Sequence, residues 1–141
     1  MDRAWLWYGK KTDQMKLTKN FSLSEFECKC GCIMPEPVKE NVEVLAGNLQ
    51  VLRNKVGPLR LTNAYRCPSH NSEVGGAENS QHLLGKAGDV KSKSLEPSEI
   101  ADITEDLMNS EKIVEGGVGR YNTFTHIDIR GAVARWNNTT K

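Results

Sequence analysis

The chain has 141 residues, of which 38% are hydrophobic and 26% are charged, as expected for one globular domain rather than a disordered tail. Nineteen basic and eighteen acidic residues leave a formal charge of +1, so the basic surplus typical of nucleic-acid-binding proteins is absent. No apolar stretch approaches the roughly 20 residues that span a bilayer. We therefore expect partners that include neither nucleic acid nor membrane. We also expect a monomer, although the composition itself is silent on oligomeric state.

The chain begins with an aromatic group, Trp5, Trp7 and Tyr8, followed directly by lysines. A secretory signal would need an apolar stretch of roughly 7–15 residues and a small-residue cleavage site, and neither is present, so we expect synthesis in the cytoplasm without an export signal. We predict an N-terminal extension at 1–19, one domain at 20–136 and a C-terminal tail at 137–141. The aromatic residues are expected to pack on the core rather than to form a docking patch.

Two helical segments are predicted at the start of the domain. The segment FSLSEF at 21–26 has Ser22 and Glu25 at the spacing of a capping box, which predicts a short helix. After two prolines, the segment 38–56 has apolar residues at steps of three and four, which predicts an amphipathic helix that a Gly-Pro pair ends. These apolar residues are Val42, Leu45, Leu49, Leu52 and Val56.

Strands and helices are then predicted to follow one another. Residues 59–62 alternate as in a half-buried strand, and 68–74 are expected to form one or two helical turns that two glycines stop. A longer helix is expected from Pro97, with Ser94 or Ser98 near its cap. Its inner face is expected to contain Ile100, Ile103, Leu107 and Met108.

The last predicted strands lie at 114–121, which is glycine-rich, and at 125–130, where polar and apolar residues alternate. The alternation places His126, Asp128 and Arg130 on one face of the strand and the two isoleucines between them on the other, which we expect to be the core. Helices around a few short strands indicate an α+β fold with a small antiparallel sheet packed against helices.

Four cysteines are present, Cys28, Cys30, Cys32 and Cys67. They could ligate a structural zinc ion, but the usual spacing between cysteine ligands in closed zinc sites is two to four residues, and here it is one, twice. A disulfide to Cys67 is a second interpretation. Reduced thiols near the surface are the interpretation that we favour, and the sequence leaves the other two open.

The segment SQHLLGKAGD at 80–89 contains two candidate metal ligands, His82 and Asp89. On a continuous helix, residues seven apart lie about 10.5 Å apart along the axis, too far to share an ion. A chain reversal at Gly85 would instead make His82 and Asp89 opposite partners on neighbouring strands, about 5 Å apart. With His126 they would supply two nitrogens and one carboxylate, the donor set of a catalytic zinc site with a position left for water. The pattern alone also allows ordinary surface or hydrogen-bonded roles for each of them.

Several segments, in this order along the chain, together resemble a known family. They are FSLSEF at 21–26, NAYRCPSHN at 63–71, VGG at 74–76, SQHLLGKAGD at 80–89 and HID at 126–128. They resemble the zinc D-alanyl-D-alanine carboxypeptidases and L-alanyl-D-glutamate endopeptidases of bacteria and bacteriophages. This group shares a fold with the dipeptidases of vancomycin resistance and the Hedgehog signalling domain. The resemblance covers residues 20–136 and implies a Hedgehog-like fold with Zn²⁺ as cofactor.

By position, the resemblance implies that His82, Asp89 and His126 hold the metal. Arg66 matches an arginine that contacts the substrate and stabilises the developing oxyanion, as a fixed guanidinium can. Ser80 is expected to bind substrate or to steady the segment that carries the ligands. Without the resemblance, a surface salt bridge for Arg66 and a turn or cap role for Ser80 would be the simpler interpretations.

The general base is harder to assign. Some family members carry an acid three residues before the last ligand, where this chain has Thr123, and others have a His-x-His pair, where it has His126 and Asp128. Asp128 is our candidate for the catalytic base or for a residue that orients the site, because it shares a strand face with His126. A structural ion pair with Arg130 or Arg66 is the alternative.

The resemblance implies a metallopeptidase that hydrolyses the stem peptides of peptidoglycan with a metal-activated water, as a D,D-carboxypeptidase or as an L-Ala-D-Glu or D,D-endopeptidase. A small chain without an export signal fits an endolysin-like enzyme of a bacteriophage, or a hydrolase released by other means, that acts on the cell wall from the periplasm, the outside or a virion. The alternative is a non-catalytic metal-containing domain that binds wall peptides or forms part of a virion, because Thr123 stands where an acid is found in some relatives.

Overall fold

The structure is a computed structural model that describes residues 15–140, and Trp5, Trp7 and Tyr8 lie outside this range. Its helical elements are η2 (Leu23–Phe26), α2 (Glu36–Val56), α3 (Pro68–Glu73), η3 (Gln81–Leu84) and α4 (Pro97–Asn109). Its strands are β1 (Arg60–Asn63), β2 (Ala87–Lys91), β3 (Gly117–Arg120), β4 (Thr125–Asp128) and β5 (Ala134–Asn137). Within this range the helices are too short or too polar to span a bilayer.

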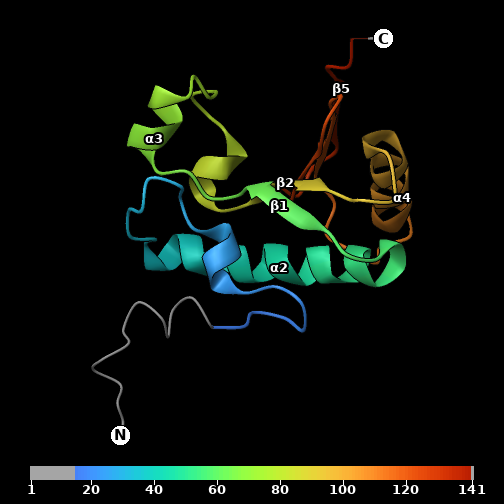
Figure 1. Ribbon diagram of the computed structural model, residues 1–141, viewed down its shortest axis with the longest axis horizontal. Coiled ribbons are helices and arrows are strands. Elements are labelled where there is room, and N and C mark those ends of the chain that lie inside the picture. The colour runs from blue at the N-terminus through green and yellow to red at the C-terminus, as the bar shows by residue number, and fades with distance from the viewer. Residues whose placement is uncertain (1–14, 141) are drawn as a thin grey trace, which may run out of the picture.

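The strands form one sheet in the order β1-β2-β4-β3-β5, beside which α2 and α4 lie (Figure 1). The pairs β1–β2, β2–β4 and β4–β3 are antiparallel, whereas β3 and β5 are parallel. β4 runs opposite to β3, and the chain reverses again after β4. β5 therefore runs in the same direction as β3. The predicted α+β class is therefore confirmed, with a sheet that is mixed rather than wholly antiparallel.

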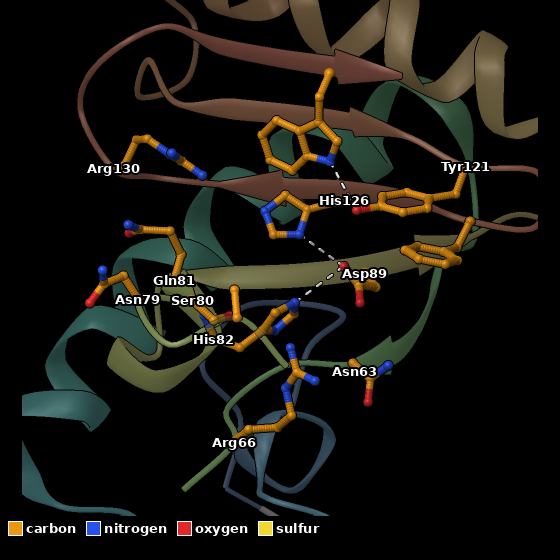
Figure 2. A pocket seen from close by; sticks show the side chains of 13 residues that line it. Asn63, Arg66, Asn79, Ser80, Gln81, His82, Asp89, Tyr121, His126 and Arg130 are labelled. Carbon is orange, nitrogen blue, oxygen red and sulfur yellow. Dashed lines mark hydrogen bonds and ion pairs between the residues drawn. The ribbon is translucent and has the colours of Figure 1, made fainter. Parts of the chain in front are cut away.

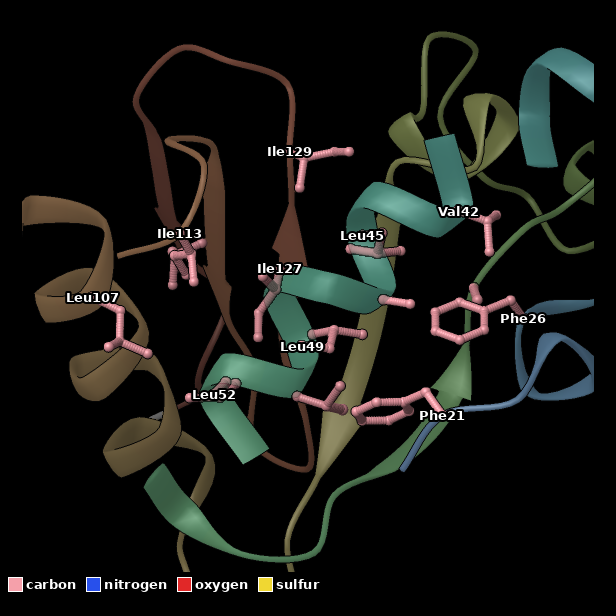
Figure 3. Packing of buried hydrophobic residues seen from close by; sticks show 14 of the residues in the cluster. Phe21, Phe26, Val42, Leu45, Leu49, Leu52, Leu107, Ile113, Ile127 and Ile129 are labelled. Carbon is pink, nitrogen blue, oxygen red and sulfur yellow. The ribbon is translucent and has the colours of Figure 1, made fainter. Parts of the chain in front are cut away.

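The hydrophobic core lies between one face of the sheet and the helices α2 and α4 (Figure 3). Leu45 and Leu49 of α2 are fully buried, and so are Ile100 of α4 and Ile127 of β4. The apolar stripe predicted for 38–56 is thus the core-facing side of α2, with Val56 partly buried at its end. The helix begins two residues earlier than predicted, at Glu36. Proline is tolerated in the first turn because the N–H that it lacks has no partner inside the helix there.

The helix ends show which capping predictions hold. Ser22 and Glu25 form the predicted capping box, in which the Ser22 amide donates to Glu25 Oε2 at 2.9 Å. The predicted start of α4 at Pro97 is confirmed; its N-cap is Glu96, between Ser94 and Ser98, and the Glu96 amide donates to Glu99 Oε1. A residue before proline is pushed into extended backbone, and an N-cap residue has this conformation, so Pro97 selects Glu96.

Candidate metal centre

One row of residues crosses all five strands. Asn63 is paired with Asp89, Asp89 with His126, His126 with Gly119 and Gly119 with Trp136. Residues paired directly across a sheet present their side chains on the same face. This face is the one opposite the core, because the next residues along β2 and β4 are buried among the helices. The sheet register therefore brings a carboxylate, an imidazole and an indole side by side.

His82 joins this row from η3. The prediction that His82 and Asp89 are strand partners is wrong, because the strand partner of Asp89 is His126 and His82 lies on a 3-10 turn. The chain does turn at Gly85, where φ is +73° and an added Cβ would come within 2.8 Å of the backbone of Val38. The backbone extends into β2 only after this turn. His82 therefore lies on the turn before β2 and not on a strand opposite Asp89.

The side chains of His82, Asp89 and His126 converge around one point (Figure 2), with one donor atom from each within 4.8 Å of the others. Asp89 Oδ1 lies 3.4 Å from His82 Nε2 and 3.1 Å from His126 Nδ1. The second nitrogen of each ring is bonded elsewhere, since His82 Nδ1 lies 2.6 Å from the Ala64 carbonyl and His126 Nε2 lies 2.8 Å from Asp128 Oδ2. If these outer nitrogens donate, the inner ones present lone pairs to the shared point.

The donor set fits a zinc ion. Two imidazoles and one carboxylate are ligands that Zn²⁺ accepts with a further position open, and outer partners that fix the ring orientation are typical of metal-binding histidines. Burial raises the pKa of Asp89, but hydrogen bonds from His126 and His82 outweigh it and lower that pKa to about 2, so Asp89 is ionised at neutral pH. Burial lowers the pKa of His126, but its bonds to Asp128 and Asp89 prevail and raise it.

Asp128 lies behind His126 and has no exposed surface. Its Oδ1 accepts from the amide of Gly117 at 2.8 Å and from Arg130 Nε at 2.9 Å, and its Oδ2 accepts from Arg130 Nη2 at 2.7 Å. Burial raises its pKa, but His126, Arg130 and the Gly117 amide hold that pKa well below its usual range. A carboxylate so saturated with donors is a poor proton acceptor, so the geometry favours the orienting role of Asp128 over the role of base.

A cavity of about 470 Å³ opens beside the three converging residues. Its lining comprises Asn63, Arg66, Ala77, Asn79, Ser80, Gln81, His82, Asp89, Tyr121, Phe124, His126, Arg130 and Trp136. Arg66 points into it (Figure 2), and the buried Nε of this side chain has no hydrogen-bond partner among residues 15–140. Ser80 lines the cavity and also caps η3, because its Oγ accepts from the His82 amide at 3.1 Å. Arg66 is therefore available to a bound molecule, whereas Ser80 also holds the turn that carries His82.

Sequence reasoning missed the aromatic wall of the cavity. Trp136 packs on His126 with ring centroids 4.9 Å apart, and its Nε1 donates to the hydroxyl of Tyr121 at 2.9 Å. Tyr121 and Phe124 stack at 4.3 Å in the turn between β3 and β4. Two aromatic residues flanking a short Asn-Thr turn are a weak signal for such a wall. Residues 134–137 alternate apolar and polar side chains, but this local pattern does not say which strand they pair with, so nothing in the sequence places Trp136 beside them.

The amino-acid sequence matches known proteins. A model of the Peptidase M15 family matches residues 19–128, a range that includes all three converging residues. The chain is also 29% identical over 99 residues to the zinc D-Ala-D-Ala carboxypeptidase of Streptomyces albus G. That match covers 69% of this chain but 38% of the relative, so the chain spans well under half of the relative's length.

Proposed function

Because the chain belongs to the Peptidase M15 family, we propose that it is a zinc-dependent peptidase that hydrolyses peptide bonds in the stem peptides of bacterial peptidoglycan. The observation that carries the proposal is the convergence of His82, Asp89 and His126 beside a cavity. Zinc as the cofactor agrees with the family and with the name of the relative. The same name supports a wall-peptide substrate, and we propose the cell wall as the place of action.

We assign the metal to His82, Asp89 and His126. Zn²⁺ bound there would act as a Lewis acid that polarises a carbonyl and lowers the pKa of a bound water towards about 7. The protein holds these ligands ready, since the Ala64 carbonyl fixes one imidazole and Asp128 the other. Because the ligands are already oriented, little free energy is lost to their reorganisation when the substrate reacts.

Arg66 is the residue that we assign to the substrate. Its guanidinium faces the cavity, and its backbone amide donates to the carbonyl of His82 at 3.1 Å, which ties it to the segment that carries a ligand. In this position it can pair with a substrate carboxylate or with the oxyanion that develops during attack. The side-chain amides of Asn63, Asn79 and Gln81 add neutral donors and acceptors suited to peptide groups.

The alternative is a non-catalytic domain that binds wall peptides around its metal. One observation favours it: among the described residues, Asp89 is the one carboxylate that lines the cavity. Thr123, where some relatives have an acid, lines a different depression with residues of α4. Asp128 lies behind His126, and its oxygens already accept hydrogen bonds from Gly117 and Arg130. A peptidase therefore needs another proton acceptor, which the substrate complex would have to supply or bring into place.

The two functions separate in one experiment. Purified protein is incubated with isolated peptidoglycan and with a defined muropeptide, products are identified by mass spectrometry, and zinc is measured per chain. A peptidase releases peptide fragments, and the fragment masses identify the bond, which distinguishes carboxypeptidase from endopeptidase activity. His82→Ala should lose one equivalent of zinc and all cleavage, whereas His70→Ala, which changes the remaining histidine outside the centre, should change neither. Zinc bound without any fragment released would favour the binding domain.

A further inference from the structure

A second cluster of metal-binding side chains lies apart from the candidate metal centre. Cys28, Cys30 and Cys32 follow η2, and Cys67 is the N-cap of α3. The expected position near the surface fits Cys30, which is exposed, but is wrong for Cys28 and Cys67, which are buried. The two buried thiols pack with Tyr65 in a small hydrophobic cluster of their own. No disulfide joins any of the four.

The four sulfur atoms lie at the distances of a tetrahedral metal site. Sγ of Cys28 is 3.3 Å from that of Cys30 and 3.8 Å from that of Cys67, and the last two are 3.4 Å apart. All four sulfurs, including that of Cys32, lie within 4.8 Å of one another. A tetrahedral zinc with Zn–S bonds of about 2.3 Å separates its sulfurs by about 3.8 Å. We propose that Cys28, Cys30, Cys32 and Cys67 bind a structural Zn²⁺ ion.

The backbone around the cluster explains how one-residue spacing can serve a single ion. The amide of Gly31 donates to the carbonyl of Cys28 at 3.0 Å, and Gly31 has a φ of +85°, so the chain folds tightly around the sulfurs. Glycine adopts this positive φ at little cost. The amide of Cys67 also donates to the sulfur of Cys28 at 3.4 Å, a contact that stabilises a thiolate. The loop therefore supplies three ligands, and the start of α3 supplies the fourth.

A metal ion fits this cluster better than a disulfide does. A disulfide would join two sulfurs and leave two thiols beside it, whereas one ion accounts for the convergence of all four. Zinc in a closed site with four cysteines is structural, because no position remains for water. The burial of Cys28 and Cys67 beside apolar side chains is consistent with such a closed site.

The ion would fasten the segment that carries Arg66. Cys67 is next to Arg66, and the amide of Tyr65 donates to the carbonyl of Phe26 at 3.1 Å. The loop at 27–34 and the segment 63–67 lie side by side, since their sulfur atoms converge. A metal bound between them would hold the arginine at the cavity without touching substrate, so its role is structural.

The first experiment removes the other metal centre. In His82→Ala/Asp89→Ala the proposed site is the remaining one, so zinc content and thiol reactivity report on the cysteines alone. We expect one zinc per chain, thiols that react with a disulfide reagent only after a strong chelator is added, and thiolate-to-metal charge-transfer absorption when Co²⁺ replaces zinc. A chain without zinc whose four thiols react at once, or one that isolates with a disulfide in the presence of zinc, would overturn the proposal.

The second experiment tests the ligands in the same background. Cys30→Ser changes an exposed ligand and should reduce the zinc content from one per chain towards none, whereas Lys29→Ala, its exposed neighbour, should keep it. A serine variant that retains zinc with unchanged affinity contradicts a four-cysteine site. Should this variant fail to fold, the cobalt spectrum and thiol protection of the chain with all four cysteines still decide the question.

Discussion

At the scale of single residues, the proposed metal site depends on which nitrogen of each imidazole faces the ion. Asp128 selects the nitrogen of His126, because its Oδ2 occupies Nε2 and leaves Nδ1 directed at Asp89. Arg130 holds Asp128 through two side-chain bonds, and Gly117 adds its amide. A Cβ on Gly117 would overlap the carboxylate of Asp128, so glycine permits this approach. We therefore propose that Asp128 positions His126.

Asp128→Asn separates the orienting role from that of a base. An asparagine can turn an amide donor towards His126 Nε2, which would favour the opposite tautomer and place the proton on Nδ1. We expect zinc affinity at the candidate metal centre to fall about 10–100-fold, as for other outer partners of metal-bound histidines. The measurement is a competition titration with a chromophoric chelator. Unchanged affinity together with lost turnover would instead support Asp128 as the base.

Arg66→Lys tests the arginine proposed to contact substrate. Lysine keeps the charge but cannot form the paired bonds of a planar guanidinium. Under the proposed function we expect kcat/KM on a muropeptide to fall about 10²–10³-fold with zinc retained. Arg60→Lys, on the exposed start of β1, is the matched control and should behave as wild type. Equal kinetics for the two variants would remove Arg66 from the site.

At the scale of elements, the parallel edge pair β3–β5 builds one wall of the cavity. Gly119 of β3 pairs with Trp136 of β5, and an added Cβ on Gly119 would overlap the indole ring. The missing side chain lets the indole lean over β3 and pack against His126 of β4. The contact with Arg130, whose Cζ lies 5.5 Å from the indole centroid, completes this side of the site.

Gly119→Ala should therefore disturb both stability and substrate binding. The methyl group forces the indole away from His126, and overpacking of this kind costs about 1–3 kcal/mol. Urea unfolding measures the change in stability. Tryptophan fluorescence, followed as a muropeptide is added, measures the change in substrate binding. Gly47→Ala, in the interior of α2 with open space around it, is the control and should be neutral or slightly stabilising. Equal unfolding midpoints for wild type and Gly119→Ala would show that Trp136 is not held by this contact.

At the scale of the whole molecule, the buried charges link stability to pH. The pKa of His126 is raised in the folded chain, so its contribution is fully present below about pH 6.5 and is lost as pH rises through the raised value. The pKa values of Asp89 and Asp128 are lowered, so their contributions are present above about pH 3.9 and are lost as pH falls towards the folded values. The metal-free network therefore contributes most between about pH 4 and 6.5.

His126→Gln measures this contribution. In the presence of chelator, the difference in unfolding free energy between wild type and variant should be about 1–3 kcal/mol near pH 5 to 6, the range for charged hydrogen bonds. It should shrink above about pH 7 and below about pH 4. A difference that stays constant or grows towards alkaline pH would contradict the raised pKa of His126. The opposite trend is expected with zinc bound, because the metal competes with the proton for His126.

Local patterns in the sequence predicted several elements and the faces that they bury. Apolar residues at steps of three and four predicted the core face of α2, and alternation at 125–130 predicted that Ile127 faces the core while His126 faces away from it. The same local patterns carried the family resemblance, which the family match confirms. These features follow from hydrogen bonds and side-chain periodicity within a few residues, so a short window of sequence is sufficient to predict them.

Which distant residues meet follows from the folded arrangement of the strands and turns. Strand register pairs Asp89 with His126 and Gly119 with Trp136, and the turn at Gly85 directs His82 to the same point. The meeting of Cys67 with the cysteine loop is of the same kind, as is the bond from the Gly117 amide to Asp128. Register and packing depend on contacts between segments far apart in the chain. Local periodicity therefore predicted the strand face of His126 but not its partners.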